Sequence, residues 1–133
     1  MIVPGPLFSE TRVLSQADFD LFARVSGDDN PIHVDPAFSA RTRFGRTVSH
    51  GMLLYTVLWG LMRRHVPVAC QGSQTLMFPA PAFADEPLVF SGEVEETDGV
   101  RAIIALQIVR AADSTTVCEA TASIVTGGGD HAH

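Results

Sequence analysis

The chain has 133 residues, of which 46% are hydrophobic and 18% are charged, and its formal net charge is −6. This length and composition predict one globular domain with a substantial core, and they exclude a disordered or fibrous chain. The acidic balance argues against general nucleic-acid binding, which needs a positively charged face. All nine basic residues are arginine, so a P-loop lysine and a Schiff-base lysine are both excluded.

The sequence also indicates in which cellular compartment the protein is expected. Its start lacks a basic segment followed by an apolar run, so no secretory signal is expected. The most apolar run, residues 51–62, is shorter than the roughly 20 residues that span a membrane. Cys70 and Cys118 lie far apart without a C-x-x-C spacing, which favours two buried thiols in a reducing compartment. A cytoplasmic protein that does not bind membranes is therefore expected.

The first part of the chain predicts a short strand at residues 7–14 and then a helix. Residues 15–18, SQAD, resemble a capping box with aspartate in place of glutamate. Apolar side chains follow at helical spacing, and Gly27 is a natural C-terminal stop. Residues 28–49 are expected to be irregular, apart from one turn of helix at residues 36–41.

Residues 51–65 predict a second helix, which ends before Pro67. Its apolar side chains occur on every side, and such a helix is normally buried all round. Met52, Tyr55 and Trp59 lie at helical spacing within it. We interpret these three side chains as core rather than as an acyl-binding pocket.

The hydrophobic period changes to two in the second half of the chain. Strands are predicted at residues 75–78, 88–95, 101–110 and 116–125, separated by proline or by aspartate-containing turns. Long strands with hairpin-like turns indicate a curved antiparallel sheet. One buried helix followed by such strands is an α+β arrangement. The simplest way to pack these elements is to wrap the sheet around the central helix, which is the hot-dog architecture.

This domain is expected to occupy residues 1–126. The glycine-rich stretch at residues 127–133 is expected to be a flexible tail. His131 and His133 are assigned to this tail rather than to a metal site.

Two polar clusters lie just ahead of the central helix: Asp28, Asn30 and His33, and then SHG at residues 49–51. An aspartate and a histidine on one turn can share a water molecule, one taking a proton while the other gives one. Gly51 would begin the helix, where a free amide and the helix dipole can stabilise a developing oxyanion. A carboxylate, an imidazole and an oxyanion donor are the groups needed to add water to an activated double bond.

The first cluster resembles a known family signature. GDDNPIH at residues 27–33 is similar to the signature of the MaoC-like hydratases, typified by the R-specific enoyl-CoA hydratases. HGM at residues 50–52 resembles the family's second hallmark, which opens the central helix. Phe78 and Pro81 ahead of Leu88 are a third similarity. The likeness covers roughly residues 7–126.

The resemblance implies a hot-dog hydro-lyase, usually a homodimer or a dimer of dimers, that needs no metal or redox cofactor. Its substrate would be a trans-2-enoyl thioester of coenzyme A or acyl carrier protein, hydrated to the (R)-3-hydroxyacyl thioester or formed by the reverse dehydration. Asp28 and His33 match the catalytic pair, and Gly51 matches the oxyanion amide. Asn30 matches the signature's asparagine, to which we assign a supporting role. Either member of the pair can be the formal base, because the two titrate as one unit.

Two further residues flank the expected oxyanion site. Ser49 stands where an aliphatic residue or alanine is common in the family, and it could tune acyl preference. His50 is assigned to the same substrate-binding region, although a purely structural role as a hydrogen-bonding group at the helix N-terminus is favoured. Arg41, Arg43 and Arg46 form a local basic cluster. They are either a solvated face or contacts for the phosphates of coenzyme A.

Three alternatives remain open at the level of sequence. A hot-dog thioesterase would direct water at the thioester carbonyl instead of the double bond. A metal enzyme could use His33, Asp35 and His50 as two histidines and one carboxylate. A non-catalytic subunit could hold an acyl thioester in the same groove without turnover.

Overall fold

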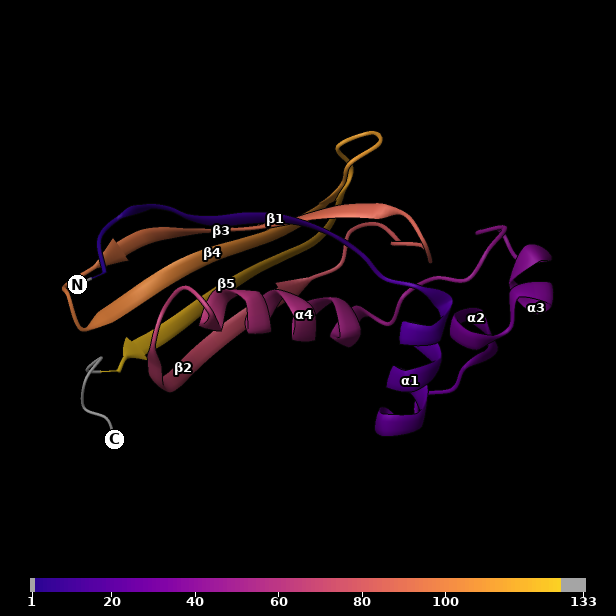
Figure 1. Cartoon of the computed structure of the whole chain (residues 1–133), viewed down its shortest axis with the longest axis horizontal. Coiled ribbons are helices and arrows are strands. Elements are labelled where there is room, and N and C mark those ends of the chain that lie inside the picture. The colour runs from indigo at the N-terminus through magenta and orange to yellow at the C-terminus, as the bar shows by residue number, and fades with distance from the viewer. Residues whose placement is uncertain (1, 128–133) are drawn as a thin grey trace.

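The computed structural model describes residues 2–127, in which one antiparallel sheet packs along a central helix (Figure 1). The sheet has five strands in the order β1-β3-β4-β5-β2, so β1 and β2 form its edges. The strands are β1 (Gly5–Val13), β2 (Val68–Met77), β3 (Pro87–Thr97), β4 (Arg101–Arg110) and β5 (Thr116–Thr126).

Four helices accompany the sheet: α1 (Gln16–Ser26), α2 (Pro31–Val34), α3 (Pro36–Ala40) and α4 (Gly51–Arg63). Helix α4 lies along one face of the sheet, and α1, α2 and α3 gather beyond its N-terminal end (Figure 1). The segment that joins α1 to α4 is therefore concentrated at one end of the molecule, next to the start of the buried helix.

Alternate residues of the central strands face α4 and form the core with it. Side chains that face α4 along the β3–β4 pair include Leu88, Phe90, Val94, Ile104 and Ile108, and all are at most 1% exposed. On the helix, Leu58 and Met62 are fully buried. This arrangement confirms the predicted α+β layout of a sheet around a central helix.

The ends of α1 follow the sequence signals. The Ser15 hydroxyl accepts from the Asp18 amide at 3.2 Å, and the Asp18 carboxylate accepts from the Ser15 amide at 2.8 Å. Gly27 ends the helix at a φ of 83°, in the left-handed region where glycine is the least strained residue. The predicted capping box and the predicted stop are both confirmed.

Helix α4 differs from its prediction. It ends at Arg63 rather than at residue 65, and it is not buried on every side, because Met52 is 49% exposed and Thr56 and Gly60 are also exposed. The sheet covers one face of the helix, and the prediction fails because the apolar side chains of Val57 and Trp59 are only half-buried and that of Met52 is exposed. Of the three side chains interpreted as core, Tyr55 is buried and Trp59 is half-buried, whereas Met52 is exposed and the interpretation is wrong for it.

Strand β2 begins at Val68, well before the predicted residue 75. Nearly all of its side chains are exposed, so no hydrophobic alternation marks its first half in the sequence. Cys70 lies on this strand and is exposed, which corrects the expectation of two buried thiols. Cys118 is buried, and burial raises its pKa to about 11.

Residues 28–49 are less irregular than expected, since they contain α2 as well as the predicted turn that became α3. No helix within residues 2–127 is both long and apolar enough to cross a membrane. Except for Gly127, whose amide donates to the Pro67 carbonyl at 2.7 Å, the predicted tail lies outside the described residues. The prediction for His131 and His133 therefore also falls outside them.

The packing predicts opposite effects for two glycine substitutions. A Cβ on Gly92 would lie 2.5 Å from the ring of Phe8 and 3.0 Å from Leu106, both buried. We expect Gly92→Ala to destabilise the fold by about 1–3 kcal/mol through overpacking. Gly60→Ala is the matched control, because its Cβ would meet nothing within 4 Å in the middle of α4. It should stabilise the fold by about 0.5–1 kcal/mol.

Thermal and urea unfolding of the two variants measure this difference. A Gly92→Ala protein as stable as the wild type would show that the contact between β1 and β3 at Phe8 is looser than the structure places it.

Candidate active site

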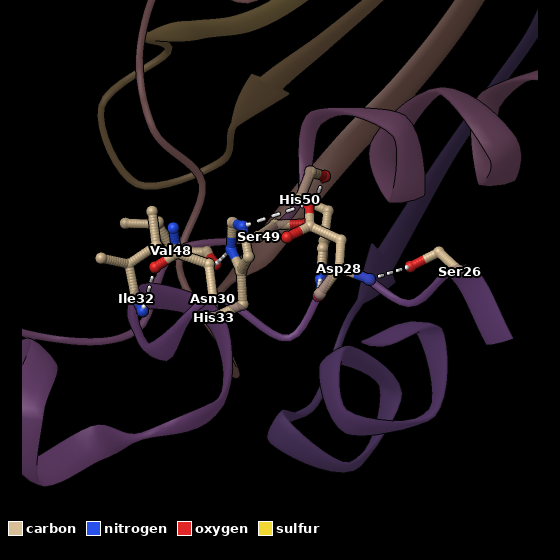
Figure 2. Close-up of polar contacts among 8 residues, drawn as sticks. All are labelled: Ser26, Asp28, Asn30, Ile32, His33, Val48, Ser49 and His50. Carbon is tan, nitrogen blue, oxygen red and sulfur yellow. Dashed lines mark hydrogen bonds and ion pairs between the residues drawn. The ribbon is translucent and has the colours of Figure 1, made fainter. Parts of the chain in front are cut away.

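The two polar clusters of the sequence meet in the structure. The Val48 amide donates to the Ile32 carbonyl at 2.9 Å, which pairs residues 28–33 with residues 48–51. His33 Nδ1 lies 2.8 Å from the Val48 carbonyl oxygen, and His50 Nε2 lies 2.8 Å from the Asp28 carbonyl oxygen (Figure 2). Three hydrogen bonds therefore bring the predicted catalytic pair to the start of α4.

Asp28 and His33 face one another across a short gap. Asp28 Oδ2 lies 3.8 Å from His33 Nε2, with the Asp28 side chain 57% exposed and the His33 side chain 11% exposed. A carbonyl oxygen only accepts, so the hydrogen bond to Val48 places a proton on Nδ1 of His33, and in the neutral ring Nε2 then carries the lone pair. Two acceptors separated by this distance match a water molecule that donates to both.

Local sequence explains how these two residues are presented. Asp28 follows Gly27, whose left-handed backbone turns the chain out of α1. The Asn30 side chain then accepts from the Ile32 amide at 3.1 Å and caps α2, with Pro31 at its first position. Asn30 thereby fixes the start of the short helix that carries His33.

His50 stands at the N-cap position of α4, but its side chain makes no capping hydrogen bond. The predicted role as an N-terminal hydrogen-bonding group is wrong in that form. Its ring instead stacks on His33, with ring centroids 3.8 Å apart and planes inclined by 24°. Burial lowers the pKa of His50 and outweighs the opposing effect of its hydrogen bond to Asp28.

Gly51 is the first residue of α4, so its amide has no partner within the helix. A Cβ at this position would lie 3.0–3.1 Å from ring atoms of Phe78. Glycine therefore allows the aromatic ring to lie directly against the start of the helix. The half-buried Ser49 donates its amide to the Ala82 carbonyl at 2.8 Å and its hydroxyl to the His50 carbonyl at 3.0 Å.

Two residues absent from the sequence-based site also hold it together. Gln16, at the start of α1, donates to the His33 carbonyl at 2.8 Å and accepts from the Thr47 hydroxyl at 2.6 Å. This side chain ties the segment of His33 and the residues just before the second polar cluster to α1. No spacing or motif distinguishes Gln16 in the sequence, because its partners are brought near only by the folded segment.

The three arginines of the basic cluster are all exposed, but they differ in their contacts. The Arg46 guanidinium lies 4.3 Å from the centroid of the Phe83 ring and 3.8 Å from the Glu86 carboxylate. Arg41 donates to the Ala37 carbonyl at 3.1 Å, and Arg43 lies over the ring of its near neighbour Phe44. Arg46 thus connects the site segment to the loop before β3, whereas among residues 2–127 the partners of Arg41 and Arg43 lie within their own segment.

Asp28, His33 and His50 are the one group within residues 2–127 whose ligand atoms could hold a metal ion, since one atom from each lies within 4.8 Å of the others. Two histidines and one carboxylate suit a transition metal. The alternative set with Asp35 is not assembled, because the Asp35 carboxylate accepts from the Phe38 amide at 3.0 Å and caps α3.

A comparison with protein families matches residues 4–122 to the MaoC like domain. An (R)-specific enoyl-CoA hydratase of Aeromonas caviae is 41% identical over 85 residues, covering 61% of this chain and 60% of the relative. A mitochondrial 3-hydroxyacyl-[acyl-carrier-protein] dehydratase of Arabidopsis thaliana is 34% identical over 85 residues, covering 64% of this chain and 51% of the relative. The matches thus span between half and three fifths of the length of these curated relatives.

The fold has equally clear counterparts among solved structures. The (R)-hydratase of Aeromonas caviae involved in PHA biosynthesis superposes with a TM-score of 0.87 and 27% identity, covering 95% of this chain and 98% of that one. The (R)-hydratase PhaJ1 of Pseudomonas aeruginosa gives a TM-score of 0.85 at 29% identity, covering 95% and 82%. These similarities confirm the predicted hot-dog fold.

Proposed function

Because the chain belongs to the MaoC-like domain family, we propose that it is a hydro-lyase acting on 2-enoyl thioesters. The reaction is addition of water to a trans-2-enoyl thioester to give the (R)-3-hydroxyacyl thioester, or the reverse dehydration. The observation that carries this proposal is the pair of acceptors on Asp28 and His33, which lie 3.8 Å apart next to His50, the residue that precedes Gly51 at the start of α4.

The proposed reaction begins with one water molecule held between Asp28 Oδ2 and His33 Nε2. The thioester carbonyl accepts a hydrogen bond from the Gly51 amide, which draws electron density from the double bond toward the oxygen. The water oxygen then bonds to C3 while the Asp28–His33 pair takes one of its protons. Charge accumulates on the carbonyl oxygen at the N-terminus of α4, where the helix dipole favours it.

The second half of the reaction returns a proton to C2 from the same pair, so that one water has been added and both side chains are restored. The hydrogen bond from His33 Nδ1 to the Val48 carbonyl keeps the imidazole oriented throughout. No step in this scheme needs a metal or a redox cofactor.

The substrate is proposed to be an enoyl-CoA, by analogy with the relatives named as enoyl-CoA hydratases. An acyl-carrier-protein thioester is the other carrier named among the relatives. We also propose a reducing compartment such as the cytoplasm, consistent with two unpaired cysteines.

Removing either member of the pair should abolish most of the activity. We expect Asp28→Ala and His33→Ala each to lower kcat for crotonyl-CoA by about two or more orders of magnitude, the size expected for a general acid or base. Loss of the enoyl absorbance measures hydration. Asp29→Ala is the matched control, because Asp29 is an exposed neighbouring carboxylate.

The Asp29→Ala protein should retain the wild-type rate. A near-normal hydration rate in Asp28→Ala or His33→Ala would contradict the assignment of these two residues as the catalytic pair. Release of free thiol without loss of the double bond would identify a thioesterase instead. A parallel assay with an octenoyl-CoA extends the test to a longer acyl chain.

The exposed arginines are proposed to contact the phosphates of coenzyme A. Neutralising Arg41, Arg43 and Arg46 together should raise KM for enoyl-CoA with little change in kcat, because only uniform binding is lost. The KM of the wild type should also rise with salt more steeply than that of the triple variant. Arg63→Gln, at the opposite end of α4, is the control and should leave KM unchanged.

Because Arg46 also contacts Phe83 and Glu86, an Arg41→Gln/Arg43→Gln double variant separates binding from structure. Identical salt profiles for the wild type and both combined variants would assign the cluster to a solvated surface.

A homodimer is proposed from the edge of the sheet. Strand β2 is an edge strand whose side chains are exposed except at Val68 and Leu76, and such an edge favours pairing with another strand. Three large apolar side chains are exposed where β2 ends against α4: Met52, Met77 and Phe78. This apolar patch lies beside the edge and adjoins Gly51, so a second copy covering both would lie next to the site.

Light scattering at micromolar concentration should therefore give twice the 14.3 kDa mass of one chain. We expect Met52→Asp to shift the protein toward the monomer, because an unpaired charge would be buried at the interface. Val25→Asp is the control, since Val25 is 78% exposed on α1 and outside the patch. A monomeric wild type would contradict the proposed dimer.

A further inference from the structure

His50 contacts every part of the proposed site. Its ring stacks on His33 at 3.8 Å between centroids, and its Nε2 atom lies 2.8 Å from the carbonyl oxygen of Asp28 (Figure 2). Gly51, the proposed oxyanion donor, is the next residue in the chain. The three groups of the proposed mechanism therefore meet at one side chain that the mechanism itself does not use.

The hydrogen bonds define one tautomer for His50. The Asp28 carbonyl can only accept, so the proton of the neutral ring is on Nε2. The other nitrogen, Nδ1, is buried and has no hydrogen-bond partner among residues 2–127. A second proton would leave a charged N–H without an acceptor in the interior, and burial accordingly lowers the pKa of this residue. His50 is therefore a neutral donor.

The ring is also enclosed on its other side. Phe22 of α1 meets it edge-on, with centroids 4.8 Å apart and planes inclined by 61°. His50 is 3% exposed, so the ring has little room to rotate. Contacts from α1, α2 and the Asp28 turn fix its position relative to all three.

Two hydrogen bonds hold the main chain of Asp28. Its amide donates to the Ser26 hydroxyl at 3.1 Å, and its carbonyl accepts from His50, while its side chain is 57% exposed. The carboxylate is thus placed through the main chain, and the bond from His50 sets the orientation of the peptide that follows it.

We propose that His50 is a positioning residue, which holds the Asp28 carboxylate, the His33 imidazole and the Gly51 amide in one fixed arrangement without itself touching the reacting atoms. This inference rests on the proposed hydratase function. It assigns two separable contributions to one side chain: the Nε2 hydrogen bond orients Asp28, and the ring face orients His33.

Three substitutions separate these contributions. His50→Phe keeps an aromatic face against His33 but removes the donor. In His50→Gln the side-chain amide nitrogen can reach the position of Nε2, whereas in His50→Asn the shorter side chain cannot. The glutamine and asparagine variants both lose the ring, so the difference between them reports the hydrogen bond to Asp28.

We expect kcat for crotonyl-CoA to fall about tenfold to a hundredfold in His50→Phe and His50→Asn, because a displacement of about 1 Å in a reacting group can cost that much. The kcat of His50→Gln should be several-fold higher than that of His50→Asn, because the glutamine amide restores the hydrogen bond to Asp28. KM should stay within about twofold in all three, since the substrate contacts are retained. Melting temperatures measured in parallel should not follow the order of kcat.

Wild-type kcat in His50→Phe, equal losses in His50→Gln and His50→Asn, or losses that follow melting temperature would each overturn the positioning role. A rise in KM with kcat unchanged would overturn it as well, by indicating a direct substrate contact. Absence of hydration by the wild-type protein would instead overturn the proposed function, and this inference with it.

Discussion

The pairing of residues 28–33 with residues 48–51 is the constraint on which the site depends. Neither segment belongs to the sheet, and each is short, so their mutual hydrogen bonds define the geometry. The main-chain bond from Val48 to Ile32 sets the register of the pairing. The two histidine side chains then complete it, each by bonding to a carbonyl on the opposite segment.

The rest of the fold anchors this pairing at its ends. Helix α4 is held against the sheet by fully buried residues such as Leu58, which fixes the position of Gly51. On the opposite side, Gln16 connects α1 to His33 in the first segment and to Thr47, which directly precedes the second. The bridge between Val48 and Phe83, together with the arginine stacked on Phe83, attaches the site to the loop before β3. The segment between α1 and α4 is thus held in place by α4, by Gln16 of α1 and by the loop before β3.

Much of this could be predicted from the sequence, where the signal is local. The capping box, Gly27 and the alternation in β3, β4 and β5 are properties of neighbouring residues, and all were confirmed. Strand β2 began earlier than predicted, because exposed side chains carry no alternating pattern. The Gln16 contacts and the stacking of His50 on His33 could not be predicted, because they join segments that only the fold brings together. The assignment of Asp28 and His33 came from their residue types on one short segment and from the family resemblance, and it remains a prediction.

The two fixed ends of α1 have a consequence for how the chain can vary in length. Gln16, the first residue of α1, donates a hydrogen bond to the main chain of His33, and Gly27, which ends the helix, directly precedes Asp28. One residue inserted into this 11-residue helix would turn Asp28 by about 100° and advance it by about 1.5 Å relative to Gln16, whose side chain holds His33. Asp28 and His33 would then no longer face each other. Insertions are therefore expected to be excluded from α1 in functional homologues, while the exposed turn around Gly45 has no comparable restriction.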